Sequence, residues 1–127
     1  MAIAIEDDTR KVVESYFAAW TANRVPEAYA LLASDLEFVG PTASYKNAAQ
    51  FHPALVNFAK MTRRAEIVEL VVQGDRAAML YTCELPPPIG TLRIASFFRV
   101  EGGKIRFYET QFDATELRKV LARTAGG

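Results

Sequence analysis

The feature that most constrains the fold is a series of four strand-like segments in the second half of the chain. Segments at 65–72, 76–85, 92–100 and 105–112 are separated by Gln-Gly-Asp, a Pro-Pro-Pro-Ile-Gly loop and Glu-Gly-Gly-Lys. Strand-like runs bounded by such turn sequences are typical of antiparallel hairpins. The sequence therefore predicts a mostly antiparallel sheet that occupies the C-terminal half.

The first half of the chain has helical periodicity instead. A first helix is predicted over 9–23 and a second, opened by Pro26, is predicted to end near 34–35. A short strand follows at 36–39, and a third helical region at 47–61 contains Pro53, where we expect a kink or a fresh start. A short helix from Asp113 ends the chain. Helices gathered before a run of hairpins predict an α+β fold with helices on one face of a curved sheet.

The composition fits a single domain over 1–127, because 50% of the 127 residues are hydrophobic. Fifteen basic residues balance fifteen acidic ones, so neither a nucleic acid nor a membrane is a predicted partner. No apolar stretch reaches the ~20 residues that span a bilayer, and the N-terminus does not resemble a signal peptide. A single cysteine, Cys83, excludes an internal disulfide, and cytoplasmic localisation is the default expectation.

The last hairpin predicts which side chains share a face of the sheet. A four-residue turn places Val100 opposite Ile105, and continued pairing gives Phe97 with Tyr108, Ala95 with Thr110 and Arg93 with Phe112 on the side of a pocket. A slip of one residue would exchange the two faces. Because aromatic residues occur on both faces, the second face needs a cover, and a homodimer formed through the sheet is the simplest one.

Three stretches of the chain resemble a known superfamily. They are 16–20 (Tyr-Phe-Ala-Ala-Trp) continuing through 27–36, Tyr45-Lys-Asn with Phe51, and 103–106 continuing through Phe112-Asp113. Together they resemble the NTF2-like superfamily, and within it the SnoaL-like group of polyketide cyclase and ketosteroid isomerase-like proteins. The resemblance implies a cone-shaped barrel of three N-terminal helices on a curved, mostly antiparallel sheet, with a pocket between them and usually a homodimer. It does not fix the chemistry, since the fold hosts isomerases, cyclases, dehydratases, hydrolases and non-catalytic binders.

The resemblance transfers few catalytic groups. Tyr16 matches the tyrosine oxyanion donor of ketosteroid isomerases, but Gly40, before Pro41, stands where they have the general-base aspartate. Their second donor, an aspartate, falls at Ala95, or at Ser96 if the register slips. SnoaL-type cyclases often have a His and an Asp on the last strand, where this chain has Tyr108 and Thr110, and the Arg-x-Asp pair of limonene epoxide hydrolases is not evident. The catalytic residues therefore stay unknown, with Tyr16 and Tyr108 as the candidates.

The remaining reactive side chains have ordinary structural explanations. His52 and Cys83 are isolated, so no metal site and no cofactor are predicted. Glu109 and Gln111 are expected to face a partner subunit, and Asp113 with Glu116 forms a predicted helix capping box.

We therefore predict that the cone binds a small hydrophobic or aromatic molecule. The expected wall is aromatic and the expected polar contacts are Tyr16, Arg93 and Thr110; the wall consists of Trp20, Phe38, Phe58, Tyr81, Phe97, Tyr108 and Phe112. If the protein is an enzyme, the resemblance implies isomerisation, cyclisation or dehydration of a carbonyl compound. The alternative is a non-catalytic ligand-binding or dimerisation module with a vestigial pocket.

Overall fold

The computed structural model describes the chain over residues 2–126, with side chains over 4–123. The elements run in the order α1 (Ala2–Thr21), α2 (Val25–Tyr29), β1 (Leu32–Val39), β2 (Ser44–Tyr45), α3 (Ala48–Met61), β3 (Arg64–Gln73), β4 (Arg76–Glu84), β5 (Thr91–Glu101), β6 (Lys104–Gln111) and α4 (Thr115–Gly126).

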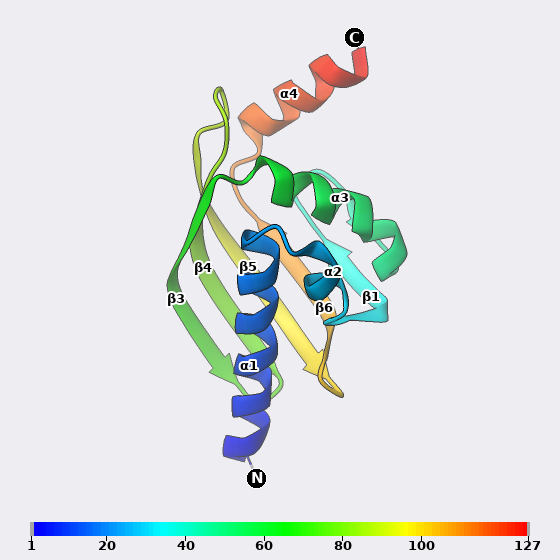
Figure 1. Cartoon of the computed structure of the whole chain (residues 1–127), viewed down its shortest axis with the longest axis vertical. Coiled ribbons are helices and arrows are strands. Elements are labelled where there is room, and N and C mark those ends of the chain that lie inside the picture. The colour runs from blue at the N-terminus through cyan, green and yellow to red at the C-terminus, as the bar shows by residue number, and fades with distance from the viewer. Residues whose placement is uncertain (1, 127) are drawn as a thin grey trace.

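The strands form one curved, unclosed sheet with the order β2-β1-β6-β5-β4-β3. All neighbours are antiparallel except β1 and β6, which are parallel. Helices α1, α2 and α3 cover the same face of the sheet, and α4 projects beyond the end of β6 (Figure 1). The α+β fold and the mostly antiparallel curved sheet are thus confirmed.

Helix α1 buries the predicted apolar face, with Val13, Tyr16 and Trp20 almost inaccessible. It begins well before the predicted residue 9, because its first turns are anchored to the β3–β4 turn. The Thr9 hydroxyl donates to the Gly74 carbonyl at 2.8 Å, and the Glu6 carboxylate accepts from the Gly74 amide at 3.0 Å. Gly74 has a φ of +59°, which favours glycine there.

The second helix is shorter than predicted. It ends at Tyr29, and the chain enters β1 at Leu32, since this segment pairs with β6. Leu32 lies opposite Ile105 and Leu36 is fully buried. Pairing and burial here outweigh the helical preference of the Leu-Leu-Ala sequence.

Helix α3 does not restart at Pro53 as we expected. Asn47 caps it, its side chain accepting from the Gln50 amide at 2.8 Å, and the helix continues through Pro53 to Met61. Phe51 and Leu55 on either side of the proline are both buried. Packing of this face therefore keeps the helix continuous although Pro53 removes one backbone donor.

A bulge in the last hairpin overturns the predicted register. Val100 does lie opposite Ile105, but Arg99 then pairs with Phe107, which leaves Arg106 as an extra residue on β6. The Arg106 guanidinium bonds both Asp35 on β1 and Glu101 on β5 at 2.7 Å. Beyond the bulge Phe98 lies opposite Tyr108 and Ser96 opposite Thr110.

Candidate ligand-binding site

A cavity of about 110 Å³ lies between α1, α3 and the inner face of the sheet. The segment that follows β1 and Leu117 on α4 contribute to its wall, and the two are joined where the Arg118 guanidinium donates to the Pro41 carbonyl at 2.7 Å. The lining is largely aromatic and aliphatic and consists of Trp20, Phe38, Gly40, Pro41, Thr42, Ala43, Tyr45, Phe51, Ala54, Leu55, Phe58, Tyr81, Tyr108, Thr110, Phe112 and Leu117. No charged side chain is among the described residues that line it.

The structure brings most of the predicted ligand contacts together. Seven of them line the cavity, namely Trp20, Phe38, Phe58, Tyr81, Tyr108, Thr110 and Phe112. Tyr16 is fully buried behind the lining, its ring meeting that of Tyr108 edge-on at 5.4 Å between centroids. Their roles in ligand binding remain predictions.

Two predicted contacts, Arg93 and Phe97, lie on the wrong face. Both are exposed on the outer side of the sheet, Phe97 with 56% of its surface accessible. The Arg106 bulge is the cause, because it shifts the alternation of β6, so that Tyr108 and Thr110 share the inner face with the even-numbered residues of β5 and not with the odd-numbered ones. Ser96, not Ala95, therefore lies opposite Thr110 on the inner face.

Sequence reasoning missed part of the wall. Phe51, Ala54 and Leu55 share a helical face with Phe58, a spacing that could have revealed them. Gly40 packs closely at the wall, since an added Cβ would lie 2.8 Å from the Phe38 ring and would displace it. Ser96 was considered only for a slipped register, and the bulge on β6 is the slip that pairs it with Thr110.

The aromatic rings of the wall pack tightly. Phe38 stacks on Phe51 at 4.2 Å between centroids, and Phe98 stacks beneath Tyr108 at 4.8 Å. Phe17 and Trp20 both meet Tyr81 at steep angles. Such contacts hold each ring in place from several sides, so the phenol groups have well-defined directions.

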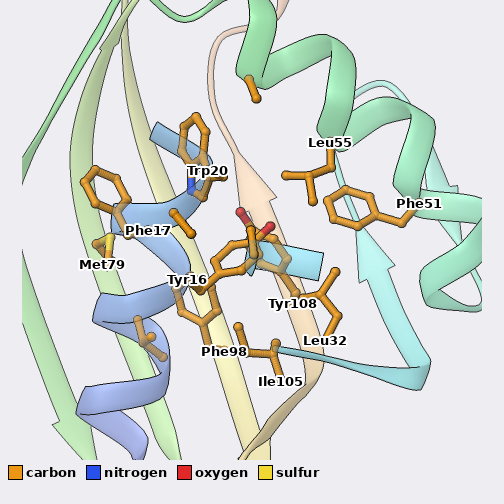
Figure 2. Close-up of a cluster of buried hydrophobic side chains, with 14 of the residues drawn as sticks. Tyr16, Phe17, Trp20, Leu32, Phe51, Leu55, Met79, Phe98, Ile105 and Tyr108 are labelled. Carbon is orange, nitrogen blue, oxygen red and sulfur yellow. The ribbon is translucent and has the colours of Figure 1, made fainter. Parts of the chain in front are cut away.

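The polar groups of the site are hydroxyls. The Ser96 hydroxyl lies 3.2 Å from that of Tyr81 on β4 and 2.9 Å from that of Thr110 on β6, within hydrogen-bond distance of both. The buried Tyr16 hydroxyl has no hydrogen-bond partner among the described residues. Figure 2 shows the hydroxyls of Tyr16 and Tyr108 directed toward the same space, between Trp20 and Leu55.

The buried phenols are held in their neutral, proton-donating form. Burial raises the pKa of Tyr16 and of Tyr81 well above the ordinary value, and the nearby Tyr108 phenol raises both further. Burial also raises the pKa of Tyr108, while the hydroxyls of Thr110, Tyr16 and Tyr81 lower it and so offset part of that rise. The site therefore offers neutral donors well into alkaline solution.

Other candidate residues are structural in this arrangement. Cys83 is buried and His52 packs edge-on against Tyr29, and the described part of the chain has no cluster of three or more His, Cys, Asp or Glu suited to a metal ion. Asp113 caps α4 by accepting from the Thr115 amide and hydroxyl at 3.1 and 2.6 Å. Glu116 pairs with Lys119 instead of completing the predicted capping box. None of the described helices combines the length and apolar character needed to cross a membrane.

The outer face of the sheet has a different character from the cavity. Val71 and Phe97 are each 56% exposed, and they adjoin Ala78, Leu80 and Phe107. Arg76 lies directly opposite Arg99 on the neighbouring strand, and neither forms an ion pair with a described residue. We call this surface, defined by Val71, Leu80, Phe97, Arg99 and Phe107, the outer sheet patch.

Comparisons with known proteins agree on the architecture. Residues 13–108 match the SnoaL-like domain family. A solved structure from Kribbella flavida DSM 17836 superposes with a TM-score of 0.82 at 19% identity, covering 92% of this chain and 96% of its own. A proposed ketosteroid isomerase from the same organism superposes with a TM-score of 0.71 at 20% identity, covering 84% of this chain and 78% of its own.

An LEH-like epoxide hydrolase of M. tuberculosis gives a TM-score of 0.73 at 16% identity, covering 96% of this chain and 98% of its own. None of the curated proteins matches the chain significantly. At identities this low the structural likeness shows the fold alone, whereas the family match covers most of the sequence. The chain therefore belongs to the SnoaL-like domain family and has an NTF2-like fold.

Proposed function

We propose that this protein binds a small hydrophobic or aromatic molecule in the cavity between its helices and its sheet. The observation that carries the proposal is a cavity whose apolar walls converge on buried hydroxyl groups, which is the usual constitution of a small-molecule site. Tyr16 and Tyr108 are the proposed donors to an oxygen of the ligand, because their hydroxyls point to a common space.

Chemistry on a carbonyl compound is a natural extension of this proposal. The family resemblance suggests isomerisation, cyclisation or dehydration, and phenol donors can stabilise charge that develops on a carbonyl oxygen. A general base is harder to assign, because position 40 lines the cavity but holds a glycine and no described carboxylate or imidazole lines it. Ligand binding is therefore the main proposal, and catalysis is an extension of it that still lacks a general base.

A cavity-filling variant tests the binding role. Ala54→Phe places a ring in the cavity, whereas Ala49→Phe adds the same ring at an exposed position of the same helix. Small cyclic ketones, screened by amide chemical-shift changes, should perturb cavity residues in the wild type and in Ala49→Phe but not in Ala54→Phe. Equal responses in both variants would contradict binding in this cavity.

We also infer that the outer sheet patch joins two copies of the chain. A twofold axis brings such a patch against itself, so that the exposed Phe97 and Val71 become buried. The unpaired Arg76 and Arg99 can then reach Glu69 and Glu109 at the borders of the patch on the other copy. Sedimentation equilibrium at micromolar concentration tests this inference, which predicts twice the chain mass. A monomer under these conditions would refute it.

A further inference from the structure

Helix α4 supplies a residue to the wall of the cavity although it lies outside the body of the fold. It follows β6 after residues 112–114, which form neither helix nor strand, and it projects beyond the end of β6 (Figure 1). Leu117, near the start of α4, is buried and lines the cavity. Part of the enclosure therefore belongs to a terminal helix and not to the core that the sheet forms with α1 and α3.

Helix α4 is docked at its N-terminal end. Ala114, just before the helix, and Leu117 are buried, whereas Lys119, Leu121 and Arg123 further along are exposed. Leu121 has 47% of its surface accessible although it is a large apolar residue. Because the buried side chains lie at this one end, α4 can swing away without unpacking α1, α3 or the sheet.

The turn at residues 40–43 faces α4 across the cavity wall and is held in place. All four of its residues line the cavity, and Thr42 is the exposed one among the lining residues. The Gly40 amide donates to the Ala43 carbonyl at 3.0 Å, and the antiparallel pairing of β1 with β2 joins the two ends of the turn. The cavity therefore meets solvent beside this turn, which is the fixed side of the opening.

A hydrogen bond joins α4 to the turn. The Arg118 guanidinium, one residue after Leu117, donates to the Pro41 carbonyl at 2.7 Å. The Arg118 side chain is exposed, so water competes for both partners and the bond is readily broken and formed again. This contact closes the wall beside Thr42 without fixing it permanently.

From this arrangement we infer that α4 is a gate over the cavity. Leu117 is its closing side chain, the hydrogen bond between Arg118 and Pro41 is its latch, and residues 112–114 are its hinge. The inference rests on the proposed function for the class of molecule that enters, and it adds the route by which the cavity is reached. In the open state α4 swings away from the turn at 40–43, and Leu117 leaves the wall.

Both ends of the hinge are anchored, so that the motion is confined to it. The Phe112 ring packs on the Phe58 ring of α3 at 6.2 Å between centroids, which holds the start of the hinge at the cavity. Asp113 accepts from the Thr115 amide at 3.1 Å, which caps α4 and keeps it helical as it moves. Opening then breaks the latch and exposes Leu117, whereas the hydrogen bonds inside α4 stay intact.

Trp20 reports access to the cavity without any ligand. It is the only tryptophan of the chain, it lines the cavity, and 3% of its surface is accessible. Acrylamide is a small neutral quencher that acts on contact, so it reaches the indole when the wall opens. The rate constant for quenching of the full chain, obtained from fluorescence lifetimes, therefore follows the fraction of molecules whose gate is open.

Two pairs of variants make the same chemical change at the gate and further along α4. Arg118→Ala removes the latch, whereas Arg123→Ala removes an exposed guanidinium; Leu117→Ala shortens the closing side chain, whereas Leu121→Ala shortens an exposed leucine. Quenching should rise about twofold to tenfold in Arg118→Ala, corresponding to one lost hydrogen bond, and should also rise in Leu117→Ala. It should stay at the wild-type value in both controls, and Arg118→Lys, which keeps a donor, should restore part of the latch.

The outcomes separate the gate from the proposed function. If each gate variant is quenched like its control, the gate is refuted, whether or not the small cyclic ketones bind. A rise in Leu117→Ala without one in Arg118→Ala contradicts the latch and with it the gate as proposed. If quenching changes as expected but the ketones do not bind, the gate is supported and the proposed function is overturned. Equal urea midpoints of Arg118→Ala and Arg123→Ala show that the rise is not caused by global unfolding.

Discussion

Removing the Tyr16 hydroxyl should stabilise the protein, which is the opposite of what truncating a buried side chain usually does. The ring makes edge-on contacts with Tyr108 and Phe98, and Tyr16→Phe retains them. The substitution deletes a buried oxygen that has no hydrogen-bond partner among the described residues. Desolvation of such a group opposes folding by about 1–3 kcal/mol, so we expect a gain of about 1 kcal/mol in the free energy of unfolding.

Tyr81→Phe is the matched comparison, because it makes the same chemical change at a hydroxyl that is bonded. Its oxygen lies 3.2 Å from the Ser96 hydroxyl, and its removal breaks that bond inside the core. We expect a loss of about 1 kcal/mol, so the two variants should differ by about 2 kcal/mol.

Urea unfolding followed by far-ultraviolet circular dichroism measures the free energy of unfolding of each variant. The dependence of this free energy on urea concentration should be the same in all variants, which shows that the unfolded state is unchanged. Tyr16→Phe should have the higher midpoint and Tyr81→Phe the lower one relative to the wild type. If both substitutions destabilise the chain equally, the Tyr16 hydroxyl has a hydrogen-bond partner in solution, and the reasoning from its missing partner is refuted.

Three further predictions concern other parts of the molecule. Burial raises the pKa of the Cys83 thiol to about 12, so iodoacetamide should leave the folded chain unmodified at pH 8 and alkylate it in urea. Since the pKa values of Tyr16 and Tyr81 are raised on folding, the unfolded chain loses those protons first; the contribution of these two phenols to stability should be constant below about pH 10 and then fall by about 1.4 kcal/mol per pH unit for each, in addition to the fall that Cys83 causes from about pH 9, measured by urea unfolding. Phe97→Asp should convert the proposed dimer to a monomer in sedimentation, because it places a charge on the outer sheet patch. The variant monomer should remain folded, since this side chain is exposed and does not contribute to the core.

The sequence was sufficient for the architecture because its strongest signals are local. Gly74 and the pair Gly102-Gly103 adopt positive φ at the hairpin turns, so the turn residues that suggested hairpins are the ones that the backbone needs. The helical spacing of apolar residues is also a local signal, and it correctly predicted that Tyr16 and Trp20 are buried. The end of α2 was missed because the start of β1 is fixed by pairing with β6, a contact between residues seventy or more positions apart.

The site was only partly predictable because one bulge residue decides which side chains face the cavity. Arg106 carries no local signal of a bulge, and its position is explained by Asp35 on β1, a charge distant in sequence, together with Glu101 across the turn. With regular pairing Ala95 would face Thr110 across the hairpin and Phe97 would lie beside Tyr108; with the bulge these places belong to Ser96 and Phe98. The inner position of Tyr108 and Thr110 and the outer position of Phe107 therefore depend on a single extra residue, an exposed arginine at the other end of β6.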